Sequence, residues 1–165
     1  MRGGFSHNAR MAKAGDVLDN PFTGQSLTFR RTAADTGGDL LEVESTWASG
    51  GQAPPEHHHP RQEEHFEVLE GELQVRIGDA ERTVRAGETI DVPPGTPHAM
   101  WNAGPASARA LWQTRPALRT EGFFELAWGL AQTAHAGREA PSGDEVAGML
   151  REYSDEFRLG RPDPA

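Results

Sequence analysis

Two histidines at a spacing of two residues are the first side chains in the sequence that could do chemistry together. His57 and His59 are separated only by His58. In an extended segment, successive side chains point to opposite faces, so His57 and His59 share one face and His58 points the other way. Imidazole nitrogens are common ligands of transition metals. The pair therefore predicts half of a metal site.

A carboxylate follows on the face of an alternating segment that is otherwise apolar. Glu64 is in phase with Phe66 and Val68, whereas Glu63 falls on the opposite face. Burying a carboxylate on an apolar face is costly unless it is paired or coordinated. We therefore predict that Glu64 contacts a cation, and a buried ion pair with an arginine is the alternative.

The fourth candidate ligand is His98, which comes directly after a proline-rich turn, residues 93–97. Such a turn is rigid and delivers His98 at the start of a new segment. A turn-capping histidine is the alternative for this residue. Because the chain has no cysteine, its metal ligands must be imidazoles and carboxylates, which favour Fe, Mn, Ni, Co, Cu or Zn. The predicted ligand set is His57, His59, Glu64 and His98.

These two stretches resemble the two signature motifs of the cupin superfamily, and no motif position departs from the pattern. The resemblance covers residues 16–117 and implies a double-stranded β-helix, or jelly-roll barrel, with one divalent transition metal in each chain. The first motif reads Gly51-x5-His57-x-His59-x4-Glu64-x6-Gly71, and the second reads Gly87-x5-Pro93-x-Gly95-x2-His98-x3-Asn102.

The hydrophobic pattern of the same region independently predicts an all-β domain. Leu73, Val75 and Ile77 alternate with polar residues until Gly78 and Asp79 mark a hairpin turn. Other short alternating segments are likewise separated by turn residues. Many short strands with regular turns are typical of a β-barrel or jelly roll.

The last part of the chain, residues 118–165, changes to a helical period and predicts a pair of α-helices. Thr120 is the predicted N-cap of the first helix, and Ser142 with Glu145 forms a capping box for the second. The candidate docking surfaces for the apolar stripes are the barrel and a second subunit. We expect both to be used, giving a homodimer, and we expect the helices to supply no metal ligand. The stripes are Phe123, Leu126 and Leu130, then Val146, Met149, Tyr153 and Phe157.

Composition limits the partners of the protein. A formal net charge of −9 opposes nucleic-acid binding, and no apolar run approaches the length of a membrane span or resembles a signal peptide. We therefore expect a soluble cytoplasmic protein whose partner is a small molecule. Residues 1–15 show no periodicity and are predicted to form a mobile arm.

A substrate pocket should be lined by residues that share the ligands' faces or lie on the next strand, namely Phe66, Val68, Val75 and Met100. This lining predicts a small, largely apolar substrate, although the same residues could simply fill the barrel. Trp47, Trp101 and Trp112 could stack on a planar substrate, but we expect them to pack in the barrel. His58 is expected to be solvated.

Three functions follow from the resemblance and the predicted site. The first is a dioxygenase similar to the single-domain cupin quercetinases, with Glu64 as the catalytic base. The second is a zinc-dependent cyclase or isomerase similar to the polyketide cyclases of the superfamily. The third is a cupin that binds a metal or small molecule without turnover. Ligand identity does not choose among them.

Overall fold

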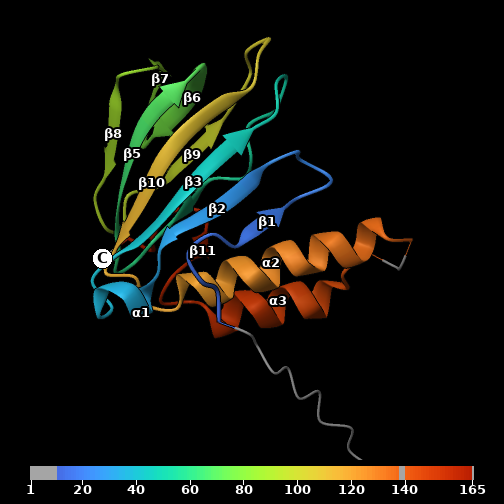
Figure 1. Cartoon of the computed structure of the whole chain (residues 1–165). Helices are drawn as coiled ribbons and strands as arrows, with labels where there is room; N and C mark the ends of the chain where they lie inside the picture. The colour runs from blue at the N-terminus through green and yellow to red at the C-terminus, as the bar shows by residue number, and fades with distance from the viewer. Residues whose placement is uncertain (1–10, 138–139, 165) are drawn as a thin grey trace, which may run out of the picture.

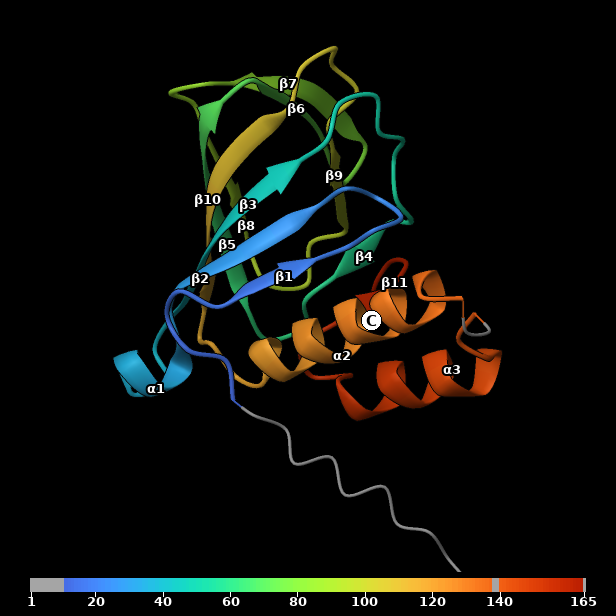
Figure 2. The same ribbon diagram turned by 45° about the vertical axis from the view of Figure 1, so that its right-hand side comes forward.

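Two antiparallel sheets face each other and enclose a barrel, and two helices lie across one end of it (Figures 1 and 2). The computed structural model describes residues 11–137 and 140–164. The predicted all-β jelly roll with two C-terminal helices is confirmed. The strands are β1 (Val17–Asp19), β2 (Ser26–Arg31), β3 (Leu41–Trp47), β4 (His57–His58), β5 (Glu63–Glu70), β6 (Glu72–Ile77), β7 (Ala80–Arg85), β8 (Thr89–Val92), β9 (His98–Trp101), β10 (Ala108–Arg115) and β11 (Arg158–Leu159).

The order of strands brings distant segments of the chain together. One sheet has the order β1-β2-β3-β10-β5-β8, and the other has the order β11-β4-β9-β6-β7. The strand β11, from the end of the chain, therefore lies at the edge of the sheet beside β4 and its histidines. This neighbour relation was not predicted from the sequence.

Alternation along the strands builds the core between the two sheets. In β5, Glu64, Phe66 and Val68 are buried, while Glu63 and Glu67 are exposed, as the period of two requires. The buried members of this core cluster are Phe66, Val68, Leu73, Val75, Val84, Ile90, Val92, Ala108 and Ala110.

Two residues of the motifs shape the barrel rather than its cavity. Gly71 has a φ of +72°, and a Cβ at this position would lie 2.6 Å from the carbonyl oxygen of Ser107, so only glycine fits. The buried side-chain amide of Asn102 donates to the carbonyls of Trp47 and Ala106. These contacts hold the connections between strands close together.

Within residues 11–137 and 140–164, three helices accompany the barrel: α1 (Ala33–Thr36), α2 (Thr120–His135) and α3 (Gly143–Glu152). The capping box of Ser142 and Glu145 is confirmed. Two helix predictions were wrong in detail. The N-cap of α2 is Arg119, and Thr120 instead accepts a hydrogen bond from the side chain of Gln62. The second helix also ends before Phe157, which lies in the turn that leads to β11.

The tail docks on the barrel of its own chain, one of the two positions predicted for it. Phe123 and Phe124 of α2 pack with Leu27 and Phe29 of the larger sheet in a second hydrophobic cluster. Of the predicted arm, residues 1–10 lie outside the described residues, whereas Ala12 is buried and its N–H donates to Glu125. None of the helices in the described ranges is long and apolar enough to cross a membrane.

Candidate metal centre

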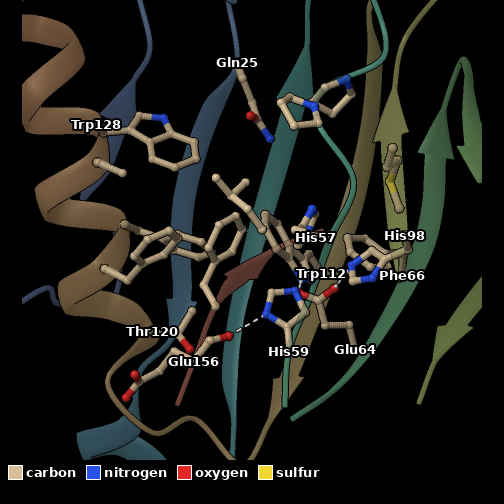
Figure 3. A pocket seen from close by; sticks show the side chains of 18 of the residues that line it. Gln25, His57, His59, Glu64, Phe66, His98, Trp112, Thr120, Trp128 and Glu156 are labelled. Carbon is tan, nitrogen blue, oxygen red and sulfur yellow. Dashed lines mark hydrogen bonds and ion pairs between the residues drawn. The ribbon is translucent and has the colours of Figure 1, made fainter. Parts of the chain in front are cut away.

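The three predicted histidine ligands converge at the end of the barrel that faces the helices (Figure 3). His57 in β4 lies directly opposite His98 in β9, because these strands pair at that register. His59 follows β4 and returns to the same side as His57, as the period of two predicted. Nitrogens of His57, His59 and His98 all lie within 4.8 Å of one another, so one ion could contact all three.

The carboxylate of Glu64 lies against this cluster, 2 % exposed. Its Oε2 is 2.9 Å from Nε2 of His98, and its Oε1 is 3.2 Å from Nε2 of His59. The indole N–H of Trp112 donates to Oε1 at 2.9 Å. The structure thus brings together all four predicted ligands, and it adds a tryptophan that orients the carboxylate.

The hydrogen bonds on the far sides of the rings define which nitrogens carry protons. Nδ1 of His59 lies 2.6 Å from the carbonyl oxygen of Glu156, and Nδ1 of His98 lies 2.9 Å from that of Thr96. A carbonyl oxygen can only accept, so each Nδ1 is the donor. In a neutral imidazole the other nitrogen, Nε2, then presents a lone pair to the ring cluster.

The Nε2 lone pairs of His59 and His98 would repel the ionised carboxylate of Glu64, because lone pairs and carboxylate oxygens can both only accept hydrogen bonds. A positive charge is therefore required between them, either a second proton on an imidazole or a metal ion. Nε2 of His59 is buried and makes no well-directed hydrogen bond within the described part of the chain. Although Glu64 is 3.2 Å away, that contact is an ion pair and not a hydrogen bond of good geometry. This donor set fits a transition-metal ion.

The local charges shift the pKa values in the direction expected without a metal. Burial opposes ionisation of Glu64, but the adjacent His59 and His98 outweigh it and hold the pKa of Glu64 well below its usual range. Burial likewise opposes protonation of His59, yet the carboxylate of Glu64 and the carbonyl of Glu156 raise the pKa of His59. A metal ion in the cluster would likewise stabilise the ionised carboxylate of Glu64.

His57 has no carboxylate of its own and behaves differently. Burial first, and then the nearby His98 and His59, lower the pKa of His57 to about 3. This imidazole is therefore neutral at physiological pH and keeps a lone pair available. Its ring stacks on that of Phe157, with 4.8 Å between centroids and 20° between planes.

The cluster opens into a cavity of about 290 Å³ between the barrel and α2. Of the predicted pocket residues, Phe66 and Met100 line this cavity, whereas Val68 and Val75 lie fully buried in the barrel core. The placement of Val68 and Val75 in the pocket needs correction. On this face of β5, Glu64 and Phe66 reach the cavity and Val68, further along the strand, does not, and no residue of β6 lines it.

Most of the aromatic lining was not predicted from the sequence. Trp47 and Trp112, for which packing was favoured over stacking on a substrate, face the cavity, while Trp101 lies outside it beneath the guanidinium of Arg76. The further aromatic residues of the lining are Phe123, Phe124, Trp128 and Phe157. The predicted helical stripe of residues 120–131 contained one of these residues, Phe123, and Phe124 and Trp128 of the same helix were not placed on it.

The tail takes part in the site, contrary to the expectation that it only covers the barrel. His58, expected to be solvated, is 4 % exposed, and its Nδ1 donates to the carbonyl of Gly160. The strand β11 pairs with β4, and the carbonyl of Glu156 accepts from His59. These contacts use backbone oxygens, which no side-chain pattern reveals.

A family model described as a cupin domain matches residues 43–114. The chain is 38% identical over 115 residues to germin-like protein 3-3 of Oryza sativa subsp. japonica, covering 63% of this chain and 50% of that protein. It is 36% identical, over the same length and shares, to oxalate oxidase GF-3.8 of Triticum aestivum. The chain thus spans about half the length of the curated relatives it matches.

Solved structures show the same fold. A recombinant oxalate oxidase in complex with glycolate is similar with a TM-score of 0.50 and 31% identity, over 64% of this chain and 56% of that chain. KdgF from Halomonas sp. is similar with a TM-score of 0.53 and 20% identity, over 61% of this chain and 86% of that chain. The second likeness concerns the fold alone.

Proposed function

Because the chain belongs to the cupin superfamily, we propose that it is a metal-dependent enzyme acting on a small, largely apolar organic molecule, namely a dioxygenase similar to the quercetinases. The observation that carries the proposal is the position of the histidine cluster. It lies at the end of a cavity whose remaining walls are mainly aromatic rings. Such walls bind flat apolar molecules through burial and ring stacking.

His57, His59 and His98 would hold the metal, with Glu64 as a fourth ligand or as a base beside it. When bound, a transition metal at this site supplies Lewis acidity and, if it is redox-active, the capacity to exchange electrons with O2 and substrate. Fe, Ni, Mn, Co, Cu and Zn all suit nitrogen and carboxylate ligands.

Glu64 is the residue best placed to accept a proton from a substrate hydroxyl. The Trp112 N–H holds Oε1, so the carboxylate presents a fixed edge to the cluster. The low pKa of Glu64 keeps it ionised, while also making it a weaker base, so its role as base rests on its position beside the cluster. The aromatic rings around it exclude water from the reacting end of the cavity.

The lining argues for a neutral aromatic substrate instead of oxalate, which two of the similar proteins are named for oxidising. Among the lining residues within the described ranges there is no lysine or arginine, whereas Glu64 and Glu156 are both present. A small dianion would have only the metal ion to replace its hydration, because no cationic side chain of the described lining would contact it. It would also leave most of the 290 Å³ unfilled.

A zinc-dependent cyclase or isomerase is the second candidate. The oriented carboxylate of Glu64 favours it, because proton transfer beside a Lewis acid requires no redox change in the metal. Binding without turnover is the third. A homodimeric state and a cytoplasmic location stay predictions from the sequence.

Reconstitution with single metals and a panel of substrates tests the proposal. Apoprotein is loaded in turn with Fe, Ni, Mn, Co, Cu or Zn, and O2 uptake is measured with flavonols, aromatic polyketides and oxalate. We expect uptake with a flavonol and a redox-active metal, and none with oxalate. Product formation with zinc and no O2 uptake would favour the cyclase or isomerase. Absence of tight metal binding, or uptake driven by oxalate, would refute the proposal.

The variant Glu64→Gln tests whether Glu64 acts as the base. The amide oxygen still coordinates weakly and the Trp112 N–H still has an acceptor, but the side chain no longer takes up a proton. We expect reduced metal affinity with loss of turnover. Unchanged turnover would remove Glu64 from the mechanism.

A further inference from the structure

The segment 156–160 at the end of the chain contacts all three consecutive histidines of the first motif. We propose that this segment, the C-terminal strap, positions the metal ligands, and that the ion pair between Arg119 and Glu156 holds the strap in place. The inference rests on the proposed function only in requiring that the histidine cluster binds a metal.

Each contact involves a different part of the strap. The carbonyl of Glu156 accepts from Nδ1 of His59 at 2.6 Å, and the ring of Phe157 stacks on His57. The carbonyl of Gly160 accepts from Nδ1 of His58 at 2.8 Å. Pairing of β11 with β4 places Arg158 opposite His58 and Leu159 opposite His57, so the strap and the histidine segment run side by side. Figure 3 shows Glu156 reaching His59.

The strap is anchored by a carboxylate that is itself buried. Glu156 is 3 % exposed, and its Oε1 accepts from both the backbone N–H and the Nε of Arg119, at 3.2 and 3.0 Å. Arg119 also donates to the carbonyl of Glu152 and lies over the ring of Tyr153. The side chain of Arg119 is 55% exposed, so the pair is partly solvated, but Arg119 supplies three of the N–H groups that contact this buried carboxylate and therefore holds Glu156 in position.

This anchor controls the orientation of a ligand through one hydrogen bond. With Nδ1 of His59 bound to the strap, Nε2 is directed at the cluster and carries the lone pair that a metal needs. If the strap moves away, the ring of His59 can rotate or exchange its tautomer. Part of the free energy of metal binding is then used to order this ring, and the metal affinity falls. Loss of such outer partners typically lowers metal affinity about 10–100-fold.

The test compares two ion pairs that join nearby residues. Arg119→Ala and Glu156→Ala each remove the anchor, whereas Asp155→Ala removes only the exposed contact with Arg61 at 3.5 Å. Zn2+ affinity is measured by competition with a chelator on the full chain. We expect a loss of about 10-fold or more in each anchor variant and no change in the control. Equal affinities in all three variants would overturn the inference.

Two further measurements separate positioning from a general loss of structure. The two anchor substitutions should be non-additive in the double variant, because they remove the same contact, and Arg119→Lys should restore part of the affinity. Nitrogen NMR of the metal-free protein, recorded at a pH high enough for His59 to be neutral, should show its proton on Nδ1 in the wild type and a mixture of tautomers in Glu156→Ala. An unchanged tautomer would overturn the inference even if the variants bound zinc more weakly.

The same measurements distinguish failure of this inference from failure of the proposed function. A wild-type protein that binds no metal would refute the proposed function, while the tautomer of His59 would still decide whether the strap positions it. A wild-type protein that binds zinc tightly, with anchor variants that match Asp155→Ala, would refute the strap alone. If Glu156→Ala does not fold, Phe157→Leu tests the ring contact with His57 and should lower zinc affinity to a smaller extent.

Discussion

The barrel wall and the helix wall of the cavity differ in chemistry and in the way they are built. The barrel wall carries His57, His59, Glu64 and His98, on or beside strands whose register is fixed by backbone pairing. The helix wall consists of aromatic rings from α2, held by packing against one another. The polar wall thus has positions fixed closely enough for chemistry, whereas the apolar wall sets the shape of what can enter.

Removing one imidazole from the barrel wall should give the largest effect. We expect His59→Ala to lower zinc affinity by more than the roughly 100-fold that loss of an outer partner can cost, since a direct ligand is removed. The fold should persist, because the apolar alternation that drives it does not involve His59. Chelator competition and circular dichroism measure the two effects separately.

His65→Ala is the matched control. It removes a histidine of β5 whose side chain is 42% exposed and pairs with Asp91 on the surface, outside the cluster. Its zinc affinity should equal that of the wild type. If the two variants behave alike, or if His59→Ala retains full metal occupancy, the assignment of the barrel wall is wrong.

The sequence predicted the barrel wall well, because its signal is local. A period of two places His57 and His59 on one face and Glu64 in phase with Phe66, and the turn before His98 marks the return of the chain. Each of these relations spans only a few residues, so the pattern of side chains is enough to infer them.

The helix wall and the strap were not predicted, because their contacts join residues far apart in the chain. The carbonyl of Glu156 meets His59 and that of Gly160 meets His58, and a backbone oxygen carries no sequence signal. A helical stripe in α2 was predicted as Phe123, Leu126 and Leu130, but of these only Phe123 lines the cavity, where it is joined by Phe124 and Trp128. An apolar stripe indicates only that the helix must cover some surface. Which surface it covers, and that Trp112 joins both walls, depends on the packing of the whole domain.

Removing one ring from the helix wall should weaken binding of an aromatic ligand without affecting the metal. Trp128 lines the cavity and packs edge-on against Phe124, with 5.5 Å between ring centroids. For Trp128→Ala we expect affinity for a flavonol to fall roughly 2–10-fold, because one aromatic contact contributes about 0.5–1.5 kcal/mol beyond its buried area. Calorimetric titration of the zinc-loaded protein measures this.

Trp101→Ala serves as the control for the tryptophan substitution, since Trp101 lies under Arg76 and outside the cavity. Its ligand affinity should not change. Equal losses in the two variants would mean that the aromatic lining does not select the ligand. A loss of zinc affinity in Trp128→Ala would show that the helix wall affects metal binding as well as the shape of the cavity.

The smallest effect should come from α2 on the side away from the cavity, where Glu121 is 7 % exposed and accepts a hydrogen bond from the backbone N–H of Ala33. Burial raises the pKa of Glu121 above its ordinary value of 4.5, so the folded state binds this proton more tightly than the unfolded state. Stability contributed by the protonated form is therefore lost as pH rises above about 4.5 and through the raised pKa. Glu121→Gln keeps an acceptor for Ala33 but does not ionise.

We therefore expect Glu121→Gln to be as stable as the wild type near pH 4 and more stable near pH 7. The gain in the free energy of unfolding should be smaller than the change of about 1 kcal/mol that is typical of point substitutions. Denaturant unfolding at the two pH values measures the difference, and Glu67→Gln, at an exposed position of β5, provides the baseline for a charge removed from the surface. Because α2 contributes shape and no ligand, zinc affinity should be the same in both variants. A variant that is less stable near pH 7 would show that the ionised form of Glu121 is the one the fold requires. The helix wall would then depend on a buried charge just as the barrel wall does.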